Sequence, residues 1–250
     1  MNRRFRAAGL HLLFSTCVAA AAALLVFQVW YPSPYGAMAG GLTLFAILVG
    51  VDVALGPLLT TVIASPTKPR AELIRDIAVI AIVQAAAFGY GVYTLALARP
   101  VYIVFEVDRL RVLAAADLEP GELAKGPASL RSLPWTGPKL IATVPPTDSA
   151  ALFDSLGRSL NGADLAMQPD HWVDYASANA AILKAARPVS ALLQKYPQLE
   201  STVRDSAASV GMSSQALRFL PLMSQRASWV ALMAVPDMRV VGFAQVDGFF

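Results

Sequence analysis

The distribution of charge along the 250-residue chain constrains its fold more than any other feature of the sequence. Asp, Glu, Lys and Arg are absent from Ala7 to Val51, a run of 45 residues, and from Ile77 to Ala98, a run of 22. Apolar stretches of about 18 residues or more are typical of membrane-spanning helices. The two runs therefore exclude an ordinary soluble globular protein. Because disorder requires low hydrophobicity and high charge, a chain with 56% hydrophobic residues is not disordered either.

We expect three membrane-spanning helices in residues 1–99, at about 7–30, 41–64 and 74–98. Each is long enough to cross a hydrocarbon core of about 30 Å at 1.5 Å per residue. A basic start followed by apolar residues is also typical of a cleaved signal peptide. However, the first apolar segment has roughly 24 residues, whereas the apolar part of a signal peptide usually has about 7–15. The sequence therefore favours a first span that is retained.

The basic residues predict the orientation of these spans. Three arginines precede the first span, the Pro32–Gly40 loop is uncharged, and Lys68, Arg70 and Arg75 flank the second loop. The positive-inside rule then predicts a cytoplasmic N-terminus. With three spans, residues from Pro100 onward lie on the far side, which in a bacterium is the periplasm, and the membrane is the inner membrane. The net charge of +3 comes from this membrane region, so no nucleic-acid partner is predicted.

Asp52 lies deep within the second predicted span, in the sequence Val51-Asp52-Val53-Ala54-Leu55-Gly56-Pro57. A carboxylate there is costly, so we expect it to face other helices or water. One interpretation is a proton relay or a catalytic carboxylate. Intramembrane aspartyl chemistry, however, needs a second carboxylate, and none occurs at comparable depth. The alternative is a polar packing contact, for which the candidate partners are Thr43, Thr60, Thr61 and Gln84.

Residues 100–250 are predicted to form a separate α+β domain that begins at Arg99-Pro100. A hairpin is expected from strands 101–107 and 110–113, with Asp108-Arg109 as the turn. The further strands are expected at 139–144, 217–223, 228–235 and 239–246, and the helices at 149–160, 171–186, 190–196 and 197–209. The predicted fold class is thus a membrane-anchored α+β protein, with three transmembrane helices followed by a periplasmic domain of antiparallel strands and several helices.

The exported half offers few residues for catalysis. His11 lies in the first span, so a Ser-His-Asp site would have to use His171. His171 and Asp174 could share a helix face, but two ligands do not define a metal site, and the single Cys17 forms neither a disulfide nor a thiolate zinc site. Glu106 and Asp108 would share a strand face without a matching acid. We therefore predict no catalytic residues, no metal and no cofactor.

Binding fits the exported half better than catalysis does. The edge of a hairpin or of a terminal strand can accept a strand from another protein. Trp135 and Trp229 are candidate partner contacts, and the alternative is that both belong to the core.

Several motifs, taken as an ordered set over about residues 10–140, resemble the TfpX/TfpZ family of type IV pilin accessory proteins. They include Asp52, Gly56 and Pro57 in the second span. The others are Lys68-Pro69-Arg70, Arg75-Asp76, Tyr90-Gly91, Arg99-Pro100 with Tyr102, Phe105-Glu106, Asp108-Arg109, Leu133-Pro134 and Gly137-Pro138. Leu110 departs from the aromatic residue expected in this family, and from about Thr147 the match is loose.

The resemblance implies a non-enzymatic, chaperone-like inner-membrane protein that assists assembly of a cognate type IV pilin and thereby affects pilus formation and twitching motility. The implied partners are this pilin and membrane lipid. Two alternatives remain open: a membrane sensor or transporter-associated subunit that uses Asp52, and a periplasmic hydrolase that uses His171. The sequence does not predict the oligomeric state or the surface that contacts the pilin.

Overall fold

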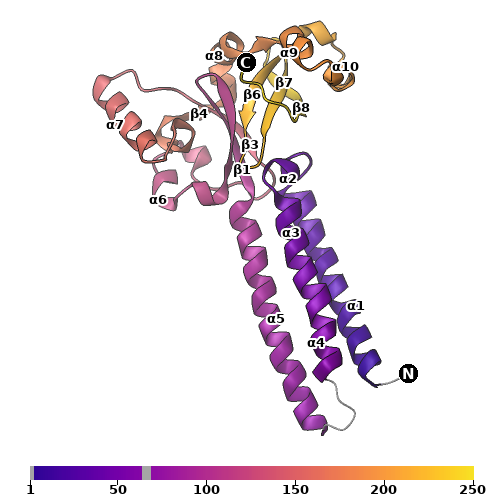
Figure 1. Ribbon diagram of the computed structural model, residues 1–250. Helices are drawn as coiled ribbons and strands as arrows, with labels where there is room; N and C mark the ends of the chain where they lie inside the picture. Colours follow the sequence, from indigo (N-terminus) through magenta and orange to yellow (C-terminus); the bar gives the residue numbers. More distant parts are fainter. Residues whose placement is uncertain (1–2, 64–68) are drawn as a thin grey trace. The chain divides into compact units, whose positions relative to one another are not determined.

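The computed structural model describes residues 3–63 and 69–250. The chain divides into two compact units, Met1–Arg99 and Pro100–Phe250 (Figure 1). The first unit is helical, and the second contains the whole sheet together with short helices.

The first unit contains three helices that are long and apolar enough to cross a membrane: Gly9–Trp30, Gly41–Ile63 and Ala71–Ala98. They are built from α1 (Arg3–Leu24) with a π-helical stretch at Leu25–Trp30, from α3 (Gly41–Gly50), a π-helical stretch at Val51–Leu55 and α4 (Gly56–Ile63), and from α5 (Arg70–Ala98). The short α2 (Tyr35–Met38) lies between the first two. Three helices were expected, and the third begins about four residues earlier than expected. The predicted end of the second, residue 64, lies outside the described residues.

The two π-helical stretches were not expected, and Pro57 gives a reason for the second. Proline has no backbone N–H, and its ring clashes with the carbonyl of the residue four positions earlier, here Val53. The stretch Val51–Leu55 ends just before Gly56-Pro57. The π-helical turn therefore lies where Pro57 interrupts the regular hydrogen bonds of the α-helix. Asp52 lies within this irregular turn.

Tyr31, which directly follows the first spanning helix, links that helix to the third by a hydrogen bond. Its side chain is 1% exposed, and its hydroxyl donates a hydrogen bond of 2.8 Å to the carbonyl of Leu95. The Tyr31 ring also lies against Gly41, where a Cβ atom added to the glycine would be only 2.6 Å from a ring carbon. Because the hydroxyl fixes the ring, it cannot move aside at low cost. By contrast, a Cβ at Gly50 meets no atom within 4 Å.

We predict that Gly41→Ala destabilises the purified protein in detergent by about 1–3 kcal/mol, the usual cost of overpacking. Gly50→Ala, in the same spanning helix, is the matched control. It should leave the melting temperature unchanged or raise it, because alanine favours a helix interior by up to about 1 kcal/mol over glycine. Thermal unfolding of both variants checks this. Equal melting temperatures for Gly41→Ala and the parent would contradict the packing of Tyr31 described above.

The second unit is built on one eight-stranded sheet in the order β4-β3-β1-β2-β6-β7-β8, with β5 also paired to β6. The strands are β1 (Pro100–Glu106), β2 (Arg109–Ala114), β3 (Lys139–Thr143), β4 (Trp172–Asp174), β5 (Arg187–Pro188), β6 (Leu217–Met223), β7 (Ser228–Ala234) and β8 (Arg239–Ala244). The helices are α6 (Pro120–Leu123), α7 (Ser149–Leu160), α8 (Asn179–Ala185), α9 (Val189–Lys195) and α10 (Glu200–Ala208).

Two buried clusters form the core of this unit. One joins β1–β4 to the segments around Leu118–Leu130 and Ala166, and the other packs α9 and α10 against β6, β7 and β8. The α+β class is confirmed. The predicted helices at 149–160, 190–196 and 197–209 and the last three strands agree with α7, α9, α10 and β6–β8 to within three residues at each end.

The sheet is mixed: five of its seven strand pairs are antiparallel, as predicted, whereas β1 pairs with β3, and β2 with β6, in parallel. The path of the chain explains the first pair. Strand β2 ends with Ala114 opposite Pro100, the first residue of β1. The segment 115–138 then runs outside the sheet and re-enters it at the same end, where Lys139 pairs with Tyr102. Strand β3 therefore runs in the same direction as β1.

Two local predictions also fail. Glu106 pairs with Arg109, so the turn of the hairpin is Val107-Asp108, and Asp108 does not share a strand face with Glu106. The predicted helix 171–186 begins late, because Trp172–Asp174 pairs with β3 as the strand β4 and Tyr175–Ala178 forms a 3-10 helix. Tertiary pairing overrides the local pattern at the start of the range, and the α-helix α8 forms only from Asn179.

Candidate functional site

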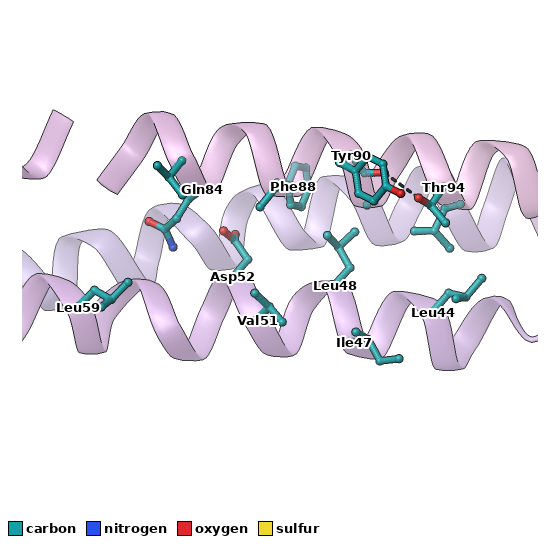
Figure 2. Close-up of a pocket in the computed structure, with 14 residues that line it drawn as sticks. Leu44, Ile47, Leu48, Val51, Asp52, Leu59, Gln84, Phe88, Tyr90 and Thr94 are labelled. Atoms are coloured by element: carbon teal, nitrogen blue, oxygen red, sulfur yellow. Dashed lines mark hydrogen bonds between the residues drawn. The ribbon is translucent and has the colours of Figure 1, made fainter. Parts of the chain in front are cut away.

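Two apolar grooves flank α5 in the membrane unit, and Asp52 and Gln84 line both of them. The first, of about 360 Å³, lies between α5 and the helix that contains Asp52. The second, of about 780 Å³, is lined by residues of α1 and α5 together with Asp52 and Thr60. Figure 2 shows Asp52 and Gln84 of α5 pointing into the same space in the first groove. The polar side chains of Asp52 and Gln84 thus lie at the place that the two apolar grooves share.

A polar cluster of five residues forms at this point: His11, Ser15, Asp52, Thr60 and Gln84. The hydroxyl of Ser15 hydrogen-bonds to the Asp52 carboxylate. The Nδ1 atom of His11 lies 2.7 Å from the hydroxyl oxygen of Thr60. Gly56 lies at the base of the cluster, and a Cβ atom added there would overlap the side-chain amide of Gln84 and approach His11 Nε2 to 2.8 Å. Glycine at position 56 therefore leaves room for both side chains.

The hydrogen bonds of Thr60 determine which nitrogen of His11 carries the proton. The Thr60 hydroxyl donates its one hydrogen to the carbonyl of Gly56, at 2.9 Å. Its oxygen must therefore accept the hydrogen of His11 Nδ1. In the neutral imidazole Nε2 is then an acceptor, so it has no hydrogen to donate to Asp52 or Gln84.

The structure joins Asp52 to residues that the sequence did not single out. Of the four candidate partners, Thr60 and Gln84 belong to the cluster. Thr61 donates to the carbonyl of Pro57, and Thr43 lines neither groove. His11 and Ser15 were missed as partners. Their spacing of four residues on one face of an otherwise apolar span is the signal that could have indicated them.

The other motif residues of the membrane unit lie outside the cluster. Pro69 precedes the first turn of α5, and Arg75 and Asp76 form an ion pair of 3.8 Å near its start. Arg99 donates to the carbonyl of Ala96 at the other end. Lys68 is outside the described residues, as is the side chain of Arg70.

In the second unit the motif residues support the sheet. The Tyr102 hydroxyl lies 3.2 and 3.1 Å from the carbonyls of Leu130 and Ser132, which share its one hydrogen, and burial raises the pKa of this phenol. Phe105 is buried, and Asp108 pairs with Arg109 at 2.7 Å beside the turn. Pro100 begins β1.

The buried Glu106 also has a structural contact, because its Oε2 accepts the backbone N–H of Ala166 at 2.8 Å. The indole N–H of Trp172 donates to the carbonyl of the same residue, at 2.9 Å. Glu106 and Trp172 together satisfy both backbone groups of Ala166. This pair fixes the segment at 165–167 against β1.

His171, the residue that a hydrolase would require, lies in an ion cluster of the second unit. Its Nε2 is 3.3 Å from Arg158 and 3.6 Å from Asp170. Arg158 also forms two hydrogen bonds with the Asp170 carboxylate, at 3.1 and 2.8 Å, and an ion pair with Asp154. The neighbours of the imidazole are thus a cation and a carboxylate. Among residues 3–63 and 69–250, no three His, Cys, Asp or Glu side chains are grouped to hold a metal ion.

The charges around Asp170 lower the pKa of its carboxyl. Burial alone would raise this pKa, but the hydrogen bond from Arg158 and the charges of His171 and Arg158 outweigh it. Because the pKa is lower in the folded than in the unfolded protein, the ionised carboxylate stabilises the fold at pH values above about 3.9. This contribution is lost as the pH falls through the folded pKa.

We predict that Asp170→Asn lowers the free energy of unfolding by about 0.5–1 kcal/mol at pH 7, a discounted value for a partly exposed ion pair. The difference between the variant and the parent should shrink between about pH 5 and pH 2, where the parent loses the same charge. Denaturant unfolding of the detergent-solubilised chain at both ends of this range measures it. The exposed acid Asp205 provides the control variant Asp205→Asn. A difference that grew on acidification would contradict the assigned direction.

The two tryptophans proposed as partner contacts differ in exposure. Trp229 is 8% exposed on β7, which agrees with the alternative role in the core, whereas Trp135 is 62% exposed. A further apolar surface lies on α7, whose polar side faces inward: Ser155 is buried and donates to Gln168 at 2.7 Å. The outward face carries Leu152, Phe153, Leu156 and Leu160, all exposed.

The chain is similar to known fimbrial assembly proteins over most of its length. The family model "Fimbrial assembly protein FimB" matches residues 1–40. The chain is 35% identical over 243 residues to "Fimbrial assembly protein, serogroup I" of Dichelobacter nodosus, which covers 96% of this chain and 94% of that protein. The serogroup E1 protein of the same organism is 34% identical, again over 96% of this chain and 94% of that protein. The protein of serogroups C1 and C2 is 46% identical over 115 residues, which are 46% of this chain and 88% of that protein. No solved structure matches the chain.

Proposed function

We propose that this chain, which belongs to the family of fimbrial assembly proteins, is a non-enzymatic membrane accessory protein that assists assembly of a cognate type IV pilin. The observation that carries the proposal is the extent of the match, since two of the relatives align over 96% of the chain and therefore over both units. The motif resemblance to TfpX/TfpZ proteins supports the narrower assignment to type IV pili. The surroundings of Glu106 and His171 support a non-enzymatic role, because each is engaged in contacts that hold the fold.

We assign the N-terminus to the cytoplasm and residues 100–250 to the periplasmic side of the inner membrane. Three spans and the basic residues at 3–6 and 68–75 support this orientation. Only Arg99 separates α5 from β1, so the second unit begins directly at the end of the last span. A pilin held in the same membrane would have its own globular part on the same side.

The two units have surfaces suited to different parts of a pilin. We assign the apolar grooves of the membrane unit to the hydrophobic helix of the pilin, because lipid-facing helices pack against one another through such surfaces. We assign Trp135 and the outward face of α7 to its globular part. Trp229 offers little surface for such a contact.

Co-purification tests this division. When the tagged chain is extracted in mild detergent from cells that make the pilin, we expect the pilin to be recovered with it. Residues 1–99 alone should recover less pilin than the full chain at equal abundance, because one of the two contacts is missing. The full-length variant Phe153→Ser, which leaves the buried side of α7 intact, should show a smaller loss in the same direction. Equal recovery with all three proteins would remove the second unit from the contact, and no recovery with the full chain would contradict the proposed function.

A further inference from the structure

We propose that the polar cluster between the membrane helices is a recognition site for a hydrogen-bond donor, a cation or an amide, carried by an apolar transmembrane helix that docks in the grooves beside α5. The identification of this helix as that of the pilin rests on the proposed function. Two features support the docking site itself. The cluster has more hydrogen-bond acceptors than donors, and the grooves on either side of it are apolar.

The acceptors are Asp52, Gln84 and, in its neutral form, His11. The Asp52 carboxylate accepts the single hydroxyl hydrogen of Ser15, which leaves further lone pairs on its two oxygens. The side-chain oxygen of Gln84 has no hydrogen-bond partner among the described residues; the atom is buried, so a docked donor reaches it when the amide turns toward the groove that the side chain lines. The proton of His11 is already used on Thr60, so its Nε2 adds another acceptor. The donors left over are the amide hydrogens of Gln84.

Among the described residues, the imidazole of His11 is the one basic side chain of this cluster, and no Lys or Arg belongs to it. Lys and Arg are absent from Ala7 to Thr67, and in α5 the last basic residue before Arg99 is Arg75, nine residues before Gln84. Nine residues of helix correspond to roughly 13 Å. In a bilayer, water does not satisfy polar groups, so an unused acceptor favours binding of a donor on a neighbouring helix.

The shape of the site favours a helix over a small molecule. Asp52 and Gln84 line both grooves, so a segment lying along either side of α5 passes the cluster. Gly89 lines the second groove with open space above it, whereas the space over Gly91 in the first groove is filled by the chain's own Leu48. Small residues of this kind let a second backbone approach closely. The occupant is therefore an apolar helix with one donor at the depth of Asp52.

Photo-cross-linking in intact membranes tests this proposal, with a photoreactive phenylalanine introduced into the full chain at one of two adjacent positions of α5. Val83 and Ile82 are both exposed, at 62% and 69%, but only Val83 lines a groove. In cells that make the pilin, we expect a pilin adduct from position 83 and little or none from position 82. Equal adducts at both positions, adducts with lipid alone, or adducts with a second copy of the chain would overturn the proposal.

The role of the cluster is tested by removing acceptors in the cross-linking protein. Asp52→Leu and Gln84→Leu should each reduce the adduct from position 83 by about five-fold, as loss of one polar contact between membrane helices predicts. Thr94→Val is the matched control, because Thr94 lines the same groove but its hydroxyl is used on the carbonyl of Tyr90, at 3.0 Å. An adduct that is insensitive to both acceptor variants, or equally sensitive to Thr94→Val, would contradict the inference.

Two further measurements keep the result interpretable. Asp52→Asn preserves the shape of the side chain: loss of the adduct identifies the donor as a cation, and retention identifies a neutral amide. Co-purification of the pilin with the same variants separates this proposal from the proposed function. If the pilin is recovered but position 83 gives no pilin adduct, the docking site is wrong and the assembly role stands. If the pilin is neither recovered nor cross-linked, both are wrong.

Discussion

The helices of the first unit cannot bury their apolar side chains in one another, and the rest of the structure depends on this constraint. In the most apolar part of each spanning helix, only 17%, 6% and 6% of the residues are buried within the structure. Lipid or a partner helix must cover the remainder. A bilayer offers no hydrogen-bond partners, so the polar side chains of His11, Asp52 and Gln84 lie between the helices, where other polar groups are near. The same constraint explains why the residues that line the grooves beside α5 are mostly apolar.

Much of the fold could be predicted from the sequence wherever a local pattern determines the structure. The spanning helices follow from the charge-free runs, and the N-terminus of α7 follows from Asp148, whose carboxylate accepts the N–H of Ala151 at 3.0 Å. The last three strands follow from short apolar runs separated by polar and turn residues. The π-helical stretch around Asp52 was not predicted, although Pro57 explains it in retrospect.

What could not be predicted depends on contacts between distant residues. Trp172 is in a strand because Thr143 pairs with it, and its own surroundings in the sequence favour a helix. The parallel pairing of β1 with β3 depends on the path of the intervening segment 115–138. For the candidate site, the sequence indicated Asp52 but not His11 or Ser15, because which helix faces of different spans meet is not encoded locally. The motif resemblance, which was loose after Thr147, indicated the assembly role, and the match of the relatives over both units supports it more broadly.

The central claim is that the second unit lies across the membrane from the N-terminus, and accessibility of single cysteines tests it most directly. In a Cys17→Ser background, cysteine is introduced either at Leu160, which is 91% exposed at the end of α7, or at Glu72, which is exposed in the first turn of α5. A maleimide that does not cross membranes is then added to cells whose outer membrane alone has been opened. We expect labelling at position 160 without further treatment, and at position 72 only after the inner membrane is made permeable. Labelling at position 72 but not at 160 in cells with an intact inner membrane would contradict the account.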